Sequence, residues 1–219
     1  YKDIISRLTV KPFSLSRSLT LSGGLSWLHG GWRQDTRYRY EARREGNTTV
    51  FAIDSSLENI GGKAARRYYG ADAQLALKHG WGKTEWRAEY WWGTQPGTAS
   101  TTVNPGEQPE GPTFIRPFDG AFFYFLQNII NPDWEVMVKY DWYDPNRMAA
   151  ASDIGKAGTN LTAADIQYNT LGVGLTRYFS DNLKVLAYYS FVNNEQTNLP
   201  EYRSDLEDDV FTLRMQMRF

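Results

Sequence analysis

Apolar and polar residues alternate one by one along several segments of this chain. In the last nine residues, every second side chain is apolar: Phe211, Leu213, Met215, Met217 and Phe219. The side chains between them are polar: Thr212, Arg214, Gln216 and Arg218. A repeat of two is that of a β-strand, whose successive side chains point to opposite faces. The segment is therefore predicted to be a strand with one apolar and one ionic face.

The same alternation, in weaker or stronger form, recurs along the whole chain. It predicts strands of roughly nine to eleven residues, about the length that spans a bilayer as a tilted β-strand. The predicted strands are 4–11, 19–29, 69–77, 84–92, 118–129, 134–143, 166–179, 183–193 and 210–219.

The connections between these strands alternate strictly between short and long. The short ones are 12–18, 79–83, 130–133 and 180–182. The long ones are 30–67, 94–117, 144–165 and 194–209. Short periplasmic turns and long extracellular loops are the rule in outer-membrane barrels, whose strand ends also carry aromatic girdles. We therefore expect an all-β fold, a transmembrane antiparallel β-barrel in a bacterial outer membrane.

About nine strands is an odd number, whereas single-chain bacterial barrels have even counts. A further hairpin, 37–44 with 48–53 around Gly46 and Asn47, would add two strands and leave the number odd. We therefore expect residues 1–219 to be the C-terminal part of a single barrel domain whose N-terminal strands are missing.

The composition changes this picture little, but it narrows the functional classes. Aromatic residues make up 15% of the chain, which suits girdles, and cysteine is absent, which excludes disulfides and thiol chemistry. The net charge of -1 argues against nucleic acid as a partner. No apolar run approaches the roughly 18 residues of a membrane-spanning helix.

Five stretches of the chain resemble the phosphate-selective porin O and P family. They are GADAQLAL from Gly70, RAEYWWGTQPGT from Arg87, VKYDWYDPN from Val138, GTNLTAADIQYNTLGVG from Gly158 and the terminal FTLRMQMRF. The resemblance implies a 16-stranded, trimeric outer-membrane porin in contact with lipid and lipopolysaccharide. No site residue of the family is carried over, because its constriction loop and basic ladder lie largely in the N-terminal half.

Strand alternation assigns more basic than acidic residues to the polar face. The basic ones are Arg7, Lys11, Lys78, Lys83, Arg87, Lys139, Lys184, Arg214 and Arg218, and the acidic ones are Asp72, Glu85, Glu89, Glu135 and Asp141. Basic rings in a pore concentrate anions. The candidate pore-lining cations are Arg87, Lys139, Arg214 and Arg218. In the alternative interpretation, Arg87 and Lys139 pair with acids of neighbouring strands and only brace the wall.

The expected function is passive diffusion of small polar solutes, with a preference for anions or phosphate. The alternative is a barrel that transports nothing and serves as an anchor or subunit of a larger envelope complex. Phe219, the aromatic last residue, resembles the signal read by the barrel assembly machinery.

We expect no enzyme activity, no cofactor and no metal. His29 and His79 fall at opposite ends of the predicted strands, so they cannot share a catalytic site. The acidic cluster Asp205, Glu207, Asp208 and Asp209 could hold Ca²⁺ or Mg²⁺, but it lacks a calcium-loop spacing and is better explained as a solvated loop.

Overall fold

The computed structural model describes residues 2–102 and 111–219, and these residues form one large β-sheet. Apart from four single-turn 3₁₀ helices, the regular elements are strands. The strands are β1 (Ile4–Ser14), β2 (Leu19–Arg33), β3 (Arg39–Glu45), β4 (Thr48–Asp54), β5 (Lys63–His79), β6 (Gly82–Gly97), β7 (Thr113–Ile129), β8 (Asn131–Asp144), β9 (Tyr168–Ser180), β10 (Leu183–Asn194) and β11 (Val210–Met217). The 3₁₀ helices are η1 (Leu57–Asn59), η2 (Ala151–Asp153), η3 (Ala163–Asp165) and η4 (Pro200–Tyr202). No helix among the described residues is long and apolar enough to cross a membrane.

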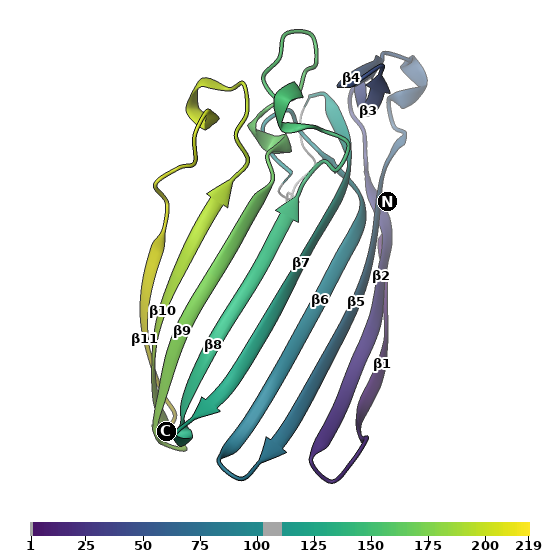
Figure 1. Cartoon of the computed structure of the whole chain (residues 1–219). Coiled ribbons are helices and arrows are strands. Elements are labelled where there is room, and N and C mark those ends of the chain that lie inside the picture. The colour runs from purple at the N-terminus through teal and green to yellow at the C-terminus, as the bar shows by residue number, and fades with distance from the viewer. Residues whose placement is uncertain (1, 103–110) are drawn as a thin grey trace.

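Nine of the strands lie side by side as an antiparallel wall (Figure 1). Their order is β1, β2, β5, β6, β7, β8, β9, β10 and β11, and each pairs with its neighbour along this path. The short turns gather at one end of the wall, here called the turn end, and the long connections at the other, here called the loop end. The sheet is open, with β1 and β11 at its two edges.

The sheet confirms the all-β class and the antiparallel pairing, but it corrects the strand count and does not form a closed barrel. It has 11 strands, compared with the nine predicted, because β3 and β4 form a hairpin inside the connection from β2 to β5. That hairpin corresponds to the segments 37–44 and 48–53. Most wall strands are also longer than predicted: β5 begins at Lys63 and β7 at Thr113, both within connections expected to be loops.

The hairpin joins the wall through a parallel contact. Arg39, Tyr40 and Glu41 of β3 pair with Thr113, Phe114 and Ile115 of β7. This edge of β7 is free because its partner β8 reaches no further than the pair Asp119 and Asp144. The hairpin therefore continues the sheet where β8 stops.

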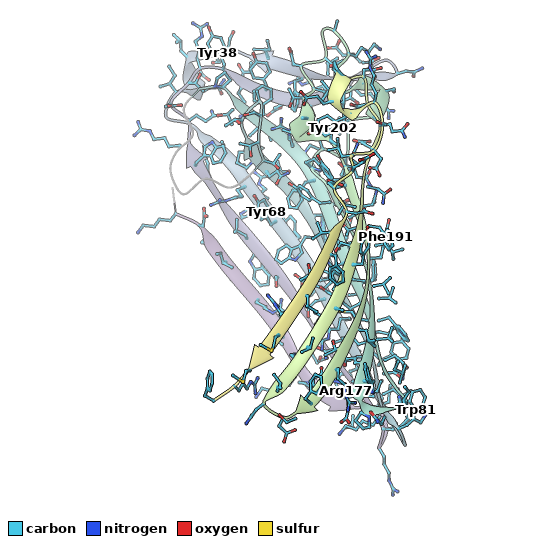
Figure 2. All side chains as sticks on the ribbon, turned by 90° about the vertical axis from the view of Figure 1, so that its left-hand side faces the viewer. Tyr38, Tyr68, Trp81, Arg177, Phe191 and Tyr202 are labelled. Carbon is cyan, nitrogen blue, oxygen red and sulfur yellow. The ribbon has the colours of Figure 1, made fainter. Side chains whose placement is uncertain are left out.

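The wall is curved and its two faces differ in chemistry. Figure 2 shows Phe191 and Arg177 on the convex side and Tyr68 on the concave side. The strand registers extend these assignments across the sheet, because directly paired residues point the same way. The convex face is a nearly continuous apolar surface, including Leu25, Ala73, Trp86, Phe123, Phe125, Val138, Tyr140, Leu171, Val173, Leu175, Leu213 and Met215. Many of these large apolar side chains are exposed.

The most buried apolar residues lie at the loop end, away from the middle of the wall. Phe51 of β4 and Phe114 of β7 pack with Ile154, Leu161 and Ile166 from the connection between β8 and β9. Phe114 is stacked on Tyr40 and meets Phe51 edge-on. The hairpin and this connection thus form one packed unit, here called the loop layer, on the concave side of β7.

Candidate functional site: the concave face

The charged residues of the concave face are arranged in rows that run across the strands. Asp72, Glu89 and Asp141 occupy one row, with Phe122 between the last two. The next row towards the turn end holds Arg87 and Lys139, separated by Tyr124. Glu85 follows one row further on. The face therefore alternates between acidic and basic layers along the strands.

Several of these charges form ion pairs within the wall. Arg7 lies 2.6 Å from Asp72, and Glu85 accepts both Lys83 at 2.8 Å and Arg87 at 3.0 Å. Lys139 contacts Asp141, and its ammonium also lies 5.7 Å from the centre of the Tyr124 ring. Such pairs hold the side chains in place and cancel part of the field along the face.

The structure places the four candidate cations in two different environments. Arg87 and Lys139 are in the same row near the middle of the face, and both are paired with acids of their own strand, two residues away. The alternative interpretation of the sequence had placed their partners on neighbouring strands. Adjacent same-face positions on one strand are close enough for long side chains to meet, which explains the difference.

Arg214 and Arg218 lie at the edge of the sheet near the turn end. Arg214 is on the concave face of β11, and Arg218 follows that strand, its backbone N–H donating to the carbonyl of Asn182. Within the described residues neither has an acid within 4.0 Å, and the same holds for Lys78 and Lys184. Among the basic residues assigned to the polar face, these four cations without an acidic partner therefore lie towards the turn end. Phe219 is fully exposed beyond β11.

Aromatic side chains line the loop-end half of the concave face, which the sequence analysis did not single out. Trp91 of β6, Phe118 and Phe122 of β7 and Tyr143 of β8 form a group here called the aromatic patch. They border a cavity of about 260 Å³, together with Glu89, Lys139 and Asp141. The signal was present in the sequence, because these aromatics alternate with the apolar positions of the other face.

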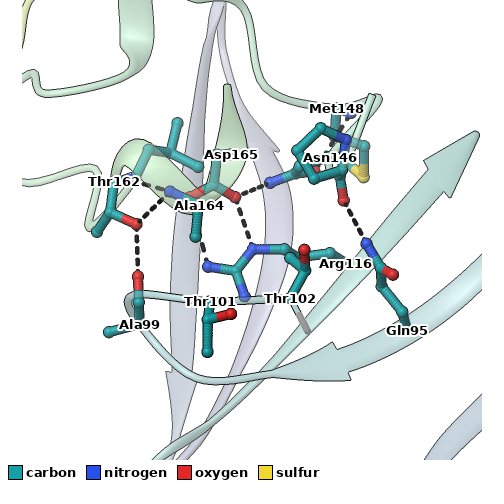
Figure 3. Close-up of polar contacts among 12 residues, drawn as sticks. Gln95, Ala99, Thr101, Thr102, Arg116, Asn146, Met148, Thr162, Ala164 and Asp165 are labelled. Atoms are coloured by element: carbon teal, nitrogen blue, oxygen red, sulfur yellow. Dashed lines mark hydrogen bonds and ion pairs between the residues drawn. The ribbon is translucent and has the colours of Figure 1, made fainter. Parts of the chain in front are cut away.

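A buried ion pair connects the wall to the loop layer (Figure 3). The guanidinium Nε of Arg116 on β7 donates to Asp165 Oδ1 at 2.8 Å, and neither side chain is accessible to solvent. Asp165 also accepts from Asn146 Nδ2 at 2.8 Å and from the backbone N–H of Thr162 at 2.9 Å. Arg116 donates in addition to the carbonyl of Thr98 at 2.8 Å. The pair is thus surrounded by hydrogen bonds, as a buried charge requires.

Two carboxyl groups beside the loop layer have raised pKa values. Burial raises the pKa of Asp144, at the loop end of β8, to about 6, and the neighbouring charges of Asp119 and Glu195 add to the effect. Burial also raises the pKa of Glu195, which accepts from the backbone N–H of Gln167 at 2.9 Å. Both groups therefore favour the protonated form more than free carboxyl groups do.

The histidines and the acidic loop cluster make ordinary structural contacts. The His79 ring lies tilted against that of Trp81, and its Nε2 is 3.1 Å from Thr84 Oγ1. His29 pairs with Ile4 at the other end of the wall. In the acidic cluster, Asp205 accepts from the backbone of Asn194 and Asp209 from that of Val192. In the described part of the chain, no group of three or more potential ligands is placed to hold a metal ion.

No family model matches this chain, and no match was found among curated proteins or solved structures. The resemblance to the phosphate-selective porin family therefore stays a prediction.

Proposed function

We propose that this chain forms part of the wall of an outer-membrane β-barrel and that the barrel is a porin. The resemblance to the phosphate-selective porin family implies 16 strands for the whole barrel. Its concave face would line a water-filled pore for small polar solutes. The observation that carries the proposal is the division of one curved sheet into an exposed apolar convex face and a charged concave face. A soluble sheet would cover the apolar face with a core.

The spacing of aromatic residues on the convex face supports a bilayer as its surroundings. Near the loop end, Tyr69, Tyr90, Trp92 and Trp142 form stacked or tilted pairs. Near the turn end, Trp134 lies beneath Arg177, whose guanidinium is 4.8 Å from the ring centre. Trp134 and Trp142 of β8 are separated by about 26 Å along the strand. With the usual strand tilt this becomes a height of about 20 Å, close to the apolar band of such barrels.

The distribution of charge supports a preference for anions at one end of the pore. Arg87 and Lys139 are largely compensated by Glu85 and Asp141. On the concave face, Lys78, Lys184 and Arg214 have no acid within 4.0 Å and lie towards the turn end, which would be periplasmic. Unpaired cations lower the electrostatic barrier for anions more than paired ones do. The anion preference is therefore assigned mainly to the turn end.

The alternative is a closed barrel that acts as an anchor or subunit of an envelope complex. The loop layer favours it, since the packed unit around Phe51 and Ile154 offers a rigid outer surface. Single-channel recording separates the two functions. The full-length protein, inserted into a planar bilayer in a KCl gradient, is expected to show open channels with an anion-directed reversal potential.

Substitutions at the two groups of cations test the assignment of selectivity. Lys184→Glu combined with Arg214→Glu is expected to move the reversal potential towards cations. Lys139→Gln combined with Asp141→Asn is the matched control, because it removes one charge of each sign. Closed channels in all preparations would favour the anchor, and a cation-selective wild type would contradict the anion preference.

A further inference from the structure

The aromatic patch contains a ring held flat against the sheet. A Cβ built on Gly70 would lie 2.8, 2.8 and 2.9 Å from three atoms of the Trp91 indole. Nearly equal distances from one point to three ring atoms mean that the indole faces the backbone of Gly70. The absence of a side chain at Gly70 allows this close approach. The opposite face of the indole is therefore directed towards the concave space.

Hydrogen bonds fix the orientation of two rings of the aromatic patch, those of Trp91 and Tyr143. The indole N–H of Trp91 donates to Glu89, two residues earlier on the same face. The Tyr143 hydroxyl accepts from Gln95 Nε2 at 2.7 Å and donates to Thr102 Oγ1 at 3.2 Å. Phe118 lies between Tyr68 and Tyr143, with ring centres 4.9 and 6.4 Å away. Such anchored rings lose little freedom when a ligand binds.

Ionic groups border the same cavity. Glu89 and Asp141 supply carboxylate oxygens, and Lys139 supplies an ammonium donor. A flat aromatic surface surrounded by both donors and acceptors matches a solute with an apolar face and a hydroxylated edge. Sugar rings have this form. The row of Asp72, Glu89 and Asp141 makes the same place unfavourable for phosphate.

We infer that the aromatic patch is a binding site for the sugar rings of a neutral carbohydrate solute. The inference rests on the proposed porin function and names a solute class for its concave face. The ring of the sugar would stack on the exposed face of Trp91, and its hydroxyls would bond to Glu89, Asp141 and Lys139. Anions would interact at the turn end, with Lys184 and Arg214, so the two solute classes would use different parts of the wall.

The test is the block of single-channel current in the full-length protein by maltotriose, a neutral linear sugar. Channels are first recorded in KCl alone, and maltotriose is then titrated from micromolar to millimolar concentrations. We expect reversible, saturable block. Trp91→Leu, which keeps an apolar side chain but removes the aromatic ring, is expected to weaken block about tenfold.

Three further variants separate stacking from folding. Trp92→Leu is the matched control, because Trp92 is the next residue but lies on the convex face; it should insert in the membrane and bind sugar as the wild type does. Gly70→Ala keeps Trp91 but places a methyl group against its ring, so it should also weaken block. Trp91→Phe, with a smaller flat ring, should restore part of the block lost in Trp91→Leu.

The outcomes distinguish the inference from the function on which it rests. Open channels that maltotriose does not block, or that it blocks equally in Trp91→Leu, would overturn the sugar site and leave the porin intact. Block by nicotinamide, a flat aromatic solute, without block by maltotriose would also overturn it. An absence of channels would overturn both.

Discussion

Arg116 of β7 and Asp165 of η3 form an ion pair with an Nε–Oδ1 distance of 2.8 Å, and both side chains are completely buried. The pair ties the wall to the connection between β8 and β9. Rings of Phe51 and Phe114 lie 5.1 and 5.2 Å from the guanidinium carbon, so the cation is enclosed by apolar groups as well as by its partner.

Removing one member of this pair is expected to loosen the loop layer. Asp165→Asn leaves the Arg116 cation without its counter-charge in a dry site, which typically costs about 3–5 kcal/mol. The double variant Asp165→Leu, Arg116→Met should lose less free energy of unfolding than the sum of the losses in Asp165→Leu alone and Arg116→Met alone. The measurement is guanidinium unfolding of the vesicle-inserted protein, with limited proteolysis of the segment 144–165. Additive effects of the single substitutions would mean that the two groups do not depend on each other.

A charge on the convex face is expected to prevent stable insertion into a bilayer. Val138 is midway between Trp134 and Trp142 on this face, and Val138→Lys should cost about 2–4 kcal/mol. Met137→Lys is the matched control, since Met137 is the preceding residue and lies on the concave face. Urea titration of folding into lipid vesicles measures both. Equal costs for the two lysines would argue against a lipid-facing convex surface.

The raised pKa values predict that mild acid stabilises the loop end. The pKa of Asp144 rises from its ordinary 3.8 to about 6 in the folded protein, mainly through burial. The folded state thus holds this proton more tightly than the unfolded state does, so the contribution of Asp144 to stability is fully present below pH 3.8 and is lost as the pH rises through about 6. Above that range the contribution is constant. Asp144 lies beyond Trp142, outside the proposed membrane band.

Protease resistance of the segment 144–165, measured at intervals from pH 7.5 to pH 5, tests this dependence. The wild type should become more resistant as the pH falls. Asp144→Asn should reduce the dependence, and Glu195→Gln should reduce it further, since burial also raises the pKa of Glu195. If Asp144→Asn kept the full dependence on pH, other groups would have to account for it.

The tight turn between β7 and β8 contains a strained residue. Ile130 has a φ of 64°, in the left-handed region, although its side chain is β-branched, and it is largely exposed. Asparagine tolerates this conformation better, so Ile130→Asn should stabilise the folded protein by about 1 kcal/mol. Unfolding in urea measures the change. Ile130→Val keeps the branched carbon and should bring no gain, and a similar gain from it would refute strain as the cause.

The wall itself could be predicted from the sequence because its main determinant is local. Alternation along 134–143 indicates a strand and also which residues share a face, and the observed strand Asn131–Asp144 keeps the predicted alternation. The assignment of Arg87, Lys139 and Arg214 to one polar face agrees with the strand registers. Whether these residues line a pore stays a prediction.

The loop end could not be predicted because its determinants are not local. The start of β7 lies between Pro112 and Pro117, and proline disfavours strands by removing a backbone donor. That segment becomes a strand because β6 and β3 pair with it on either side. For the same reason, the ion pair of Arg116 could not be predicted, because its partner Asp165 is 49 residues away in the sequence. Alternation likewise predicts that Trp91 shares a face with the charged residues, but only the folded structure shows its ring flat against Gly70.

The parallel contact between β3 and β7 constrains the order in which the molecule can assemble. Neighbouring wall strands meet through nearby parts of the chain, but Arg39 meets Thr113 only after the hairpins of β5, β6 and β7 have closed the long intervening stretch. Contacts between distant parts of a sequence form slowly, because much chain entropy is lost before they are made. The hairpin of β3 and β4 is therefore expected to dock late, on a wall that is already folded.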